Sequence, residues 1–65
     1  MVNVLVFKFN RPLGITKSAS KAIEITGAKV YDLLRNGGQS KSGYMFDYPL
    51  DGLDYRVLQS KKDVQ

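Results

Sequence analysis

Apolar residues recur along this 65-residue chain with two different periods. Residues 2–9 (VNVLVFKF) are too few for a typical helix and are rich in β-branched and aromatic side chains, so they predict a strand. Val4 and Val6 would share one face of that strand, and Leu5 and Phe7 the other. Because both faces are apolar, we expect this strand to lie in the middle of a sheet.

The spacing of apolar residues becomes helical after residue 17. Ser18 is a favourable N-cap, because its hydroxyl can accept a hydrogen bond from a free backbone N–H group. Small and apolar residues then follow at i, i+3, i+4 and i+7, which predicts a helix with a narrow buried stripe. That stripe consists of Ala19, Ala22, Ile23 and Thr26.

A second helix is predicted directly after a glycine. Gly27 suits the left-handed conformation with which many helices end. Helical spacing then resumes at Val30, Leu33 and Leu34 and stops at residues 36–38 (NGG). Small residues on the first helix would let the second cross close to it, so the pair is typical of a helix-turn-helix.

Two alternating segments near the C-terminus predict a β-hairpin. In residues 44–48 aromatic side chains alternate with other residues, as in a half-buried strand. Residues 49–52 (PLDG) are a turn signal, and residues 53–58 would form the second strand. The polar residues 60–65 predict a frayed tail.

The remaining connection follows the first strand. Residues 10–14 contain Pro12 and Gly14 and predict a loop, after which Ile15 would pack under the start of the first helix. The resulting order is β-α-α-β-β. We therefore expect one small α+β domain over residues 1–59, with a helix-turn-helix packed on a three-stranded antiparallel sheet.

The distribution of charge along the chain says more about a possible ligand than the formal net charge of +4 does. Residues 1–46 carry seven Lys or Arg against two acidic residues, which gives +5. Residues 47–65 carry three basic and four acidic residues, which gives −1. The positive field would therefore lie on the helical unit, where a polyanion is attracted. The alternative is a solvated basic surface that keeps a small protein soluble.

The residue types present argue against enzymatic chemistry. The chain has no histidine and no cysteine, so the usual general base and the strongest nucleophile are missing. Asp47, Asp51 and Asp54 are more simply turn and surface residues than a metal site, and we expect no metal and no cofactor. The absence of cysteine fits a reducing cytoplasm. No segment approaches the roughly 20 apolar residues of a membrane span, so we expect no membrane partner.

Nine residues are candidate contacts to nucleic acid. The exposed face of a helix can enter a major groove, where Arg and Lys read guanine, and a helix start offers N–H groups to phosphate. A polar loop can add contacts to the backbone. The candidates are Lys17, Ser18 and Lys21 at the first helix, Lys29, Tyr31, Asp32 and Arg35 on the second, and Gln39 and Lys41 in the loop.

Each candidate also has a simpler interpretation. Lys17 and Lys21 suit an ordinary solvated helix surface, and Tyr31 could pack against the sheet instead of facing outward. Asp32 would repel phosphate unless it accepts a hydrogen bond from cytosine.

Part of the chain resembles a known family. The residues that carry the resemblance are Lys17-Ser18, Ala22, Gly27, Val30, Leu33-Leu34, Gly37 and residues 41–46 (KSGYMF). They are similar to the small helix-turn-helix DNA-binding modules associated with intron- and phage-encoded homing endonucleases, over about residues 15–48. The resemblance implies a sequence-tolerant DNA-binding element in which Lys41 and the exposed positions of the second helix face DNA. It also implies a free-standing phage or mobile-element protein, such as a phage-encoded regulator of transcription.

Two functions of different classes follow from the sequence. The first is a small non-enzymatic protein that binds double-stranded DNA in the cytoplasm of its host, as a homodimer if it reads paired half-sites. The alternative is a phage-encoded interaction module or inhibitor that docks on an acidic host protein. In that case a contiguous patch of exposed tyrosines would anchor the interface.

Overall fold

β1 (Val4–Lys8) is the middle strand of a three-stranded antiparallel sheet with the order β2-β1-β3. The computed structural model describes residues 3–64, so Val2 of the predicted strand lies outside the described residues. The neighbouring strands are β2 (Arg11–Thr16) and β3 (Tyr44–Asp47). This position of β1 confirms the middle strand that its two apolar faces predict.

β1 and β2 form a hairpin where the sequence predicts a loop over residues 10–14. The turn residues Phe9 and Asn10 both have positive φ (51° and 65°), as a type I′ turn requires. Pro12 is tolerated because β2 is the outer strand of the sheet and its register with β1 is irregular at that point. The loop prediction is wrong because phenylalanine rarely adopts a left-handed backbone, so its presence gives no turn signal.

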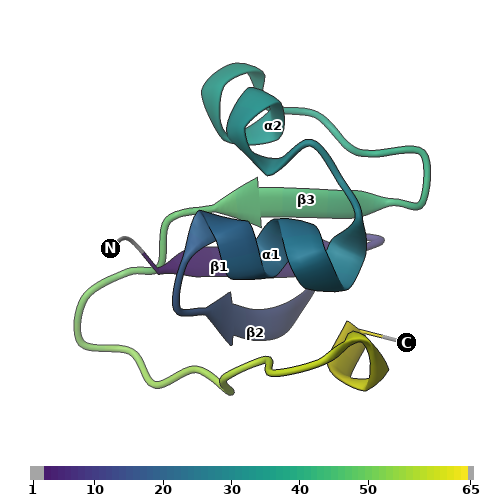
Figure 1. The fold of residues 1–65 in the computed structure, drawn as a ribbon. Helices are drawn as coiled ribbons and strands as arrows, with labels where there is room; N and C mark the ends of the chain where they lie inside the picture. The colour runs from purple at the N-terminus through teal and green to yellow at the C-terminus, as the bar shows by residue number, and fades with distance from the viewer. Residues whose placement is uncertain (1–2, 65) are drawn as a thin grey trace.

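The predicted strand over residues 53–58 does not pair with β3. The chain leaves β3 and crosses to the outer edge of β2, as the light-green segment in Figure 1 shows. There the Ile15 N–H group donates to the Arg56 carbonyl (2.8 Å) and the Leu58 N–H group donates to the Ile15 carbonyl (2.7 Å). The hairpin prediction is wrong because the backbone partner of this segment is Ile15, far earlier in the chain, and no local signal indicates that pairing.

The fold is α+β, with two helices and a three-stranded antiparallel sheet, and this confirms the predicted class. The order of the elements is β-β-α-α-β, because the third strand comes from residues 11–16 and not from residues 53–58.

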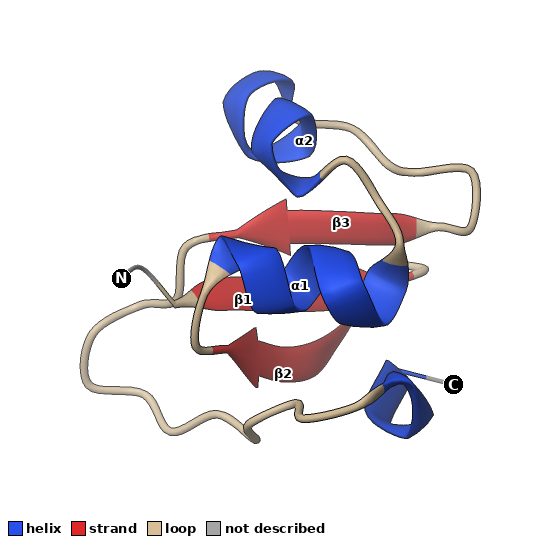
Figure 2. Ribbon diagram, in the orientation of Figure 1, coloured by secondary structure: helices blue, strands red, loops and turns tan. Residues whose placement is uncertain are grey.

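α1 (Ala19–Thr26) lies across one face of the sheet (Figures 1 and 2). Its buried residues are Ala22 and Ile25, whereas Ile23 of the predicted stripe is 37% exposed. The stripe therefore follows i, i+3 spacing, and it packs on Val4 and Val6 of β1, which are completely buried.

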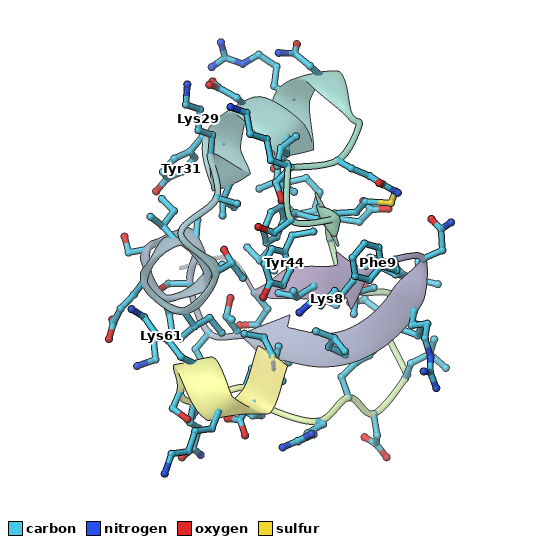
Figure 3. The ribbon with its side chains drawn as sticks, turned by 90° about the vertical axis from the view of Figure 1, so that its right-hand side faces the viewer. Lys8, Phe9, Lys29, Tyr31, Tyr44 and Lys61 are labelled. Atoms are coloured by element: carbon cyan, nitrogen blue, oxygen red, sulfur yellow. The ribbon has the colours of Figure 1, made fainter. Side chains whose placement is uncertain are left out.

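α2 (Val30–Asn36) packs beside β3 and joins the same core through its first turn. Val30 is completely buried, while Leu33 and Leu34 are half-buried against the core. The three residues between the helices, 27–29, turn the chain so that α2 runs across α1. Figure 1 shows α2 nearly end-on, and Figure 3, turned by 90°, shows it lengthwise.

Residues 61–64 are folded, in contrast to the frayed tail predicted over residues 60–65; Gln65 lies outside the described residues. They form a short 3-10 helix, η1 (Lys61–Val64), and Val64 is only 3% exposed. The Val64 carbonyl accepts hydrogen bonds from the Lys8 ammonium (3.3 Å) and the Tyr44 hydroxyl (3.4 Å). The prediction is wrong because these stabilising partners lie far away in the sequence.

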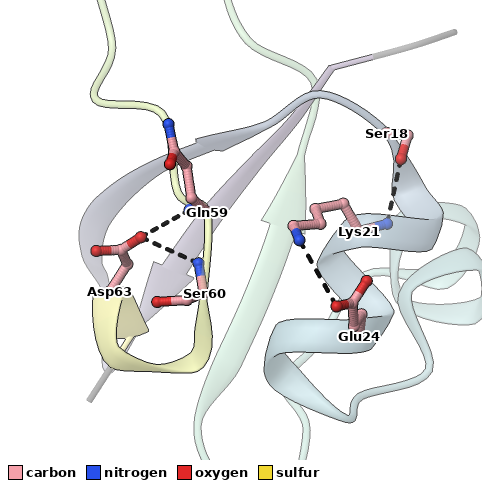
Figure 4. A network of polar contacts seen from close by, with 6 residues as sticks. All are labelled: Ser18, Lys21, Glu24, Gln59, Ser60 and Asp63. Carbon is pink, nitrogen blue, oxygen red and sulfur yellow. Dashed lines mark hydrogen bonds and ion pairs between the residues drawn. The ribbon is translucent and has the colours of Figure 1, made fainter.

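Asp63 stabilises the start of η1 through hydrogen bonds and an ion pair. Its carboxylate accepts hydrogen bonds from the backbone N–H groups of Gln59 (2.6 Å) and Ser60 (3.1 Å), as Figure 4 shows. Arg56 adds an ion pair at 2.8 Å. The two backbone hydrogen bonds, and then the Arg56 charge, lower the pKa of Asp63 below its ordinary value.

We expect Asp63→Asn to lower the free energy of unfolding at pH 7, because the variant loses the charged acceptor. A carboxyl group with a lowered folded-state pKa stabilises the fold above its unfolded-state pKa, and this contribution disappears as pH falls through the folded-state pKa. The difference from the parent protein should therefore shrink below about pH 4. Denaturant titrations at pH 7 and pH 3 measure it. Asp54→Asn, in the exposed loop after β3, is the control with little effect at either pH.

Gly14 allows the last part of the chain to approach β2. Its φ is +152°, and a Cβ at this position would overlap the Arg56 carbonyl oxygen and lie 3.1 Å from Leu58 Cδ2. We expect Gly14→Ala to lower the free energy of unfolding by about 3 kcal/mol, from backbone strain and overlap together. Gly38→Ala separates the two causes, since its φ is +92° but nothing lies within 4 Å. It should cost about 1 kcal/mol; equal losses in denaturant titrations would contradict the close approach.

Candidate nucleic-acid interface

Ser18 begins α1 as the sequence predicts. Its backbone is extended (φ −159°, ψ 161°), and its hydroxyl oxygen accepts a hydrogen bond from the Lys21 N–H group (3.1 Å, Figure 4). The Thr16 hydroxyl, in a completely buried residue, donates to the Ser18 carbonyl at 2.8 Å. The helix also ends as predicted, at Gly27 with φ 69°, whose N–H group donates to the Ile23 carbonyl.

The two lysines at the start of α1 are not equally free to bind a phosphate. Lys17 is exposed, but the Lys21 ammonium lies 3.6 Å from the Glu24 carboxylate. A surface ion pair of this kind contributes little stability, yet it offsets part of the positive charge that Lys21 would present to phosphate. Lys17, Ser18 and Lys21 line a shallow hollow together with residues 57–59.

The polar residues of α2 face solvent, as its helical spacing predicts. Lys29, immediately before the helix, is exposed, as are Asp32 and Arg35 within it. Tyr31 is 60% exposed, which excludes the alternative that it packs against the sheet. Figure 3 shows Lys29 and Tyr31 projecting outward beside one another.

Hydrogen bonds fix the loop between α2 and β3 around Ser40. The Ser40 carbonyl accepts from the Gly43 N–H group (2.9 Å), and the Ser40 hydroxyl accepts from the Tyr44 N–H group (3.1 Å). Gln39 donates from its side-chain amide to the Met45 sulfur at 3.4 Å. Lys41 is therefore presented to solvent at the tip of an ordered turn.

A groove of about 490 Å³ separates this loop from the turn between the helices. Lys29 and Asp32 line one side, and Gln39 and Lys41 line the other. Together with Tyr31 and Arg35, which lie on α2 outside the groove lining, they form a surface that we call the α2 face. Its members are Lys29, Tyr31, Asp32, Arg35, Gln39 and Lys41.

The nine predicted residues thus form two groups. Six belong to the α2 face, whereas Lys17, Ser18 and Lys21 lie near the opposite end of α1. Eight residues of helix separate the two ends by about 12 Å. α2 runs crosswise to α1, and its polar side is open to solvent.

Sequence reasoning did not identify Phe9, at the tip of the β1–β2 hairpin. Phe9 is 66% exposed, and its N–H group donates to the Gly43 carbonyl (3.0 Å), beside the loop that carries Lys41. No sequence signal indicates this contact, because it depends on the pairing of β1 with β3. The neighbouring Lys8 faces inward, with its ammonium 5.2 Å from the centre of the Tyr44 ring.

Comparisons with protein-family models, with curated proteins and with solved structures found no match to this chain. No helix within residues 3–64 has the length and apolar composition to cross a membrane. Nor do the described Asp and Glu side chains form a group of three or more that could hold a metal ion.

The Ser18 cap is testable by substitution. We expect Ser18→Ala to lower the free energy of unfolding by about 1 kcal/mol, because the Lys21 N–H group loses its acceptor. Ser20→Ala, exposed in the first turn of the same helix, is the matched control and should change it by less than about 0.5 kcal/mol. Thermal or denaturant unfolding provides the comparison, and equal effects of the two substitutions would refute a capping role.

Proposed function

We propose that this chain is a small non-enzymatic DNA-binding protein that contacts double-stranded DNA through the α2 face. The observation that carries the proposal is the set of exposed charges on that face. Among the described residues, ion pairs join only Lys21 to Glu24 and Arg56 to Asp63. The charges of Lys29, Arg35 and Lys41 are therefore available to phosphates.

In this proposal α2 lies at the major groove, with its buried side toward β3. Arg35 and Lys29 are long enough to reach guanine edges or phosphates. Lys41, which lies across the protein's own groove from Lys29, contacts the DNA backbone. Asp32 then faces a base edge instead of a phosphate, where it can accept a hydrogen bond from cytosine. Lys17 and the start of α1 contact a neighbouring phosphate.

The size of the molecule, compared with the spacing of DNA half-sites, indicates how many copies would bind. Its largest extent is 30 Å, whereas half-sites one helical turn apart are separated by about 34 Å. One copy therefore covers one half-site, and a homodimer is needed to read two. We place this activity in the cytoplasm of the host, with regulation of transcription as the role that fits such binding.

Docking on an acidic host protein receives less support. That function requires a contiguous patch of exposed tyrosines, but Tyr44 is buried and Tyr55 is half-buried with its hydroxyl accepting from the Leu50 N–H group (3.2 Å). Tyr48 is exposed, but it lies in the segment that follows β3 and is not part of α2. The described tyrosines thus supply one anchor to the α2 face, alongside three cationic side chains.

Titration against a labelled DNA duplex at several salt concentrations tests the proposal. Neutralisation of roughly three to five phosphates predicts a slope of log K against log salt of about −3 to −4.5. The double variant Lys29→Glu/Arg35→Glu should bind about tenfold or more weakly than the parent protein.

Lys61→Glu/Lys62→Glu, with the same change in net charge on η1, is the matched control and should lose less than about threefold. Equal losses in the two double variants would show that α2 is not the contact surface. Undetectable duplex binding at low salt would overturn the proposed function itself.

A further inference from the structure

Phe9 adopts a backbone conformation that its side chain disfavours. Its φ of 51° lies in the left-handed region, where glycine and asparagine are the usual residues of a type I′ turn. Asn10, the next turn residue, follows that preference with φ 65°. A bulky aromatic residue at Phe9 therefore strains the hairpin, and strained residues of this kind cluster at functional sites.

The Phe9 ring is supported on one side and open on the other. A Cβ on Gly43 would overlap its Cδ1 and Cε1 atoms and lie 3.0 Å from Cζ, so this side of the ring rests on the bare glycine backbone. The ring is nonetheless part of a residue that is 66% exposed. The hydrogen bond from the Phe9 N–H group to the Gly43 carbonyl fixes the position from which the ring projects.

The surroundings of the ring suit a polyanion. Gly43 closes the ordered turn that presents Lys41, so Phe9 borders the α2 face. Arg11, exposed at the start of β2, directly follows the hairpin turn that contains Phe9. In Figure 3 the ring lies at the end of the molecule that faces the viewer.

We propose that Phe9 is a stacking platform for an unpaired base in the DNA that the α2 face binds. The inference rests on the proposed function and names its ligand more closely, as a duplex that contains an unpaired or splayed nucleotide. An aromatic ring with one free face can stack on one base, whereas a wedge inserted between two base pairs needs both faces open. Arg11, two residues after Phe9, and Lys41, two residues before Gly43, hold the phosphates that flank the base.

Two DNA probes that differ only by one inserted nucleotide test the inference. One is fully paired, and the other carries a single bulged 2-aminopurine, whose fluorescence falls when it stacks. The parent protein should bind the bulged probe about fivefold or more tightly than the paired one, with quenching of the 2-aminopurine. Phe9→Asn should remove both effects and leave affinity for the paired probe unchanged. Its fold should persist, since asparagine suits the left-handed turn, and thermal unfolding verifies this.

Two further variants complete the test. Phe9→Tyr keeps an aromatic ring and should retain the preference for the bulged probe. Tyr48→Asn removes an exposed aromatic residue beyond the opposite end of β3 and should also leave it unchanged. Equal affinity of the parent protein for both probes, or a preference that survives Phe9→Asn, overturns the stacking role and leaves the proposed function intact. Binding to neither probe overturns both.

Discussion

The fold depends on the burial of one face of β1. Val4 and Val6 on that face are completely buried, and both helices and the C-terminal segment pack on the core they form. A 65-residue chain buries only about 60% of its unfolded surface, and no described residue is a cysteine that could add a disulfide. Leu58 and Val64, from the distant end of the chain, are therefore needed to close this core.

The same core determines which side chains reach solvent at α2. Because Val30 is held in the core at the first turn, the polar residues of this short helix have to lie on the opposite side. The closed turn around Ser40 then sets Lys41 across from Lys29. A surface that concentrates positive charge thus follows directly from the requirement to bury a few apolar residues.

Local signals explain what the sequence predicted correctly. The ends of α1 depend on Ser18 and Gly27, whose effects are confined to adjacent residues, and the exposure of α2 follows from a simple repeat. The hairpin at Phe9 was missed because its turn contradicts residue preference. The sequence did not predict that residues 53–58 lie beside β2 or that the chain is folded at Val64. Both features depend on partners dozens of residues away. Likewise, the sequence assigned the candidate residues to the two helices and the loop, but it did not indicate the groove that sets Lys29 and Asp32 opposite Gln39 and Lys41.

The hydrogen bond between Lys8 and Val64 has a consequence for how the protein is made. These residues are separated by 56 positions, so β1 cannot complete its packing until η1 has also been synthesised. Contacts of such long sequence separation slow folding. During synthesis the apolar β1–β2 hairpin emerges before the helices that cover it, so chaperones and proteases can compete with folding during that interval.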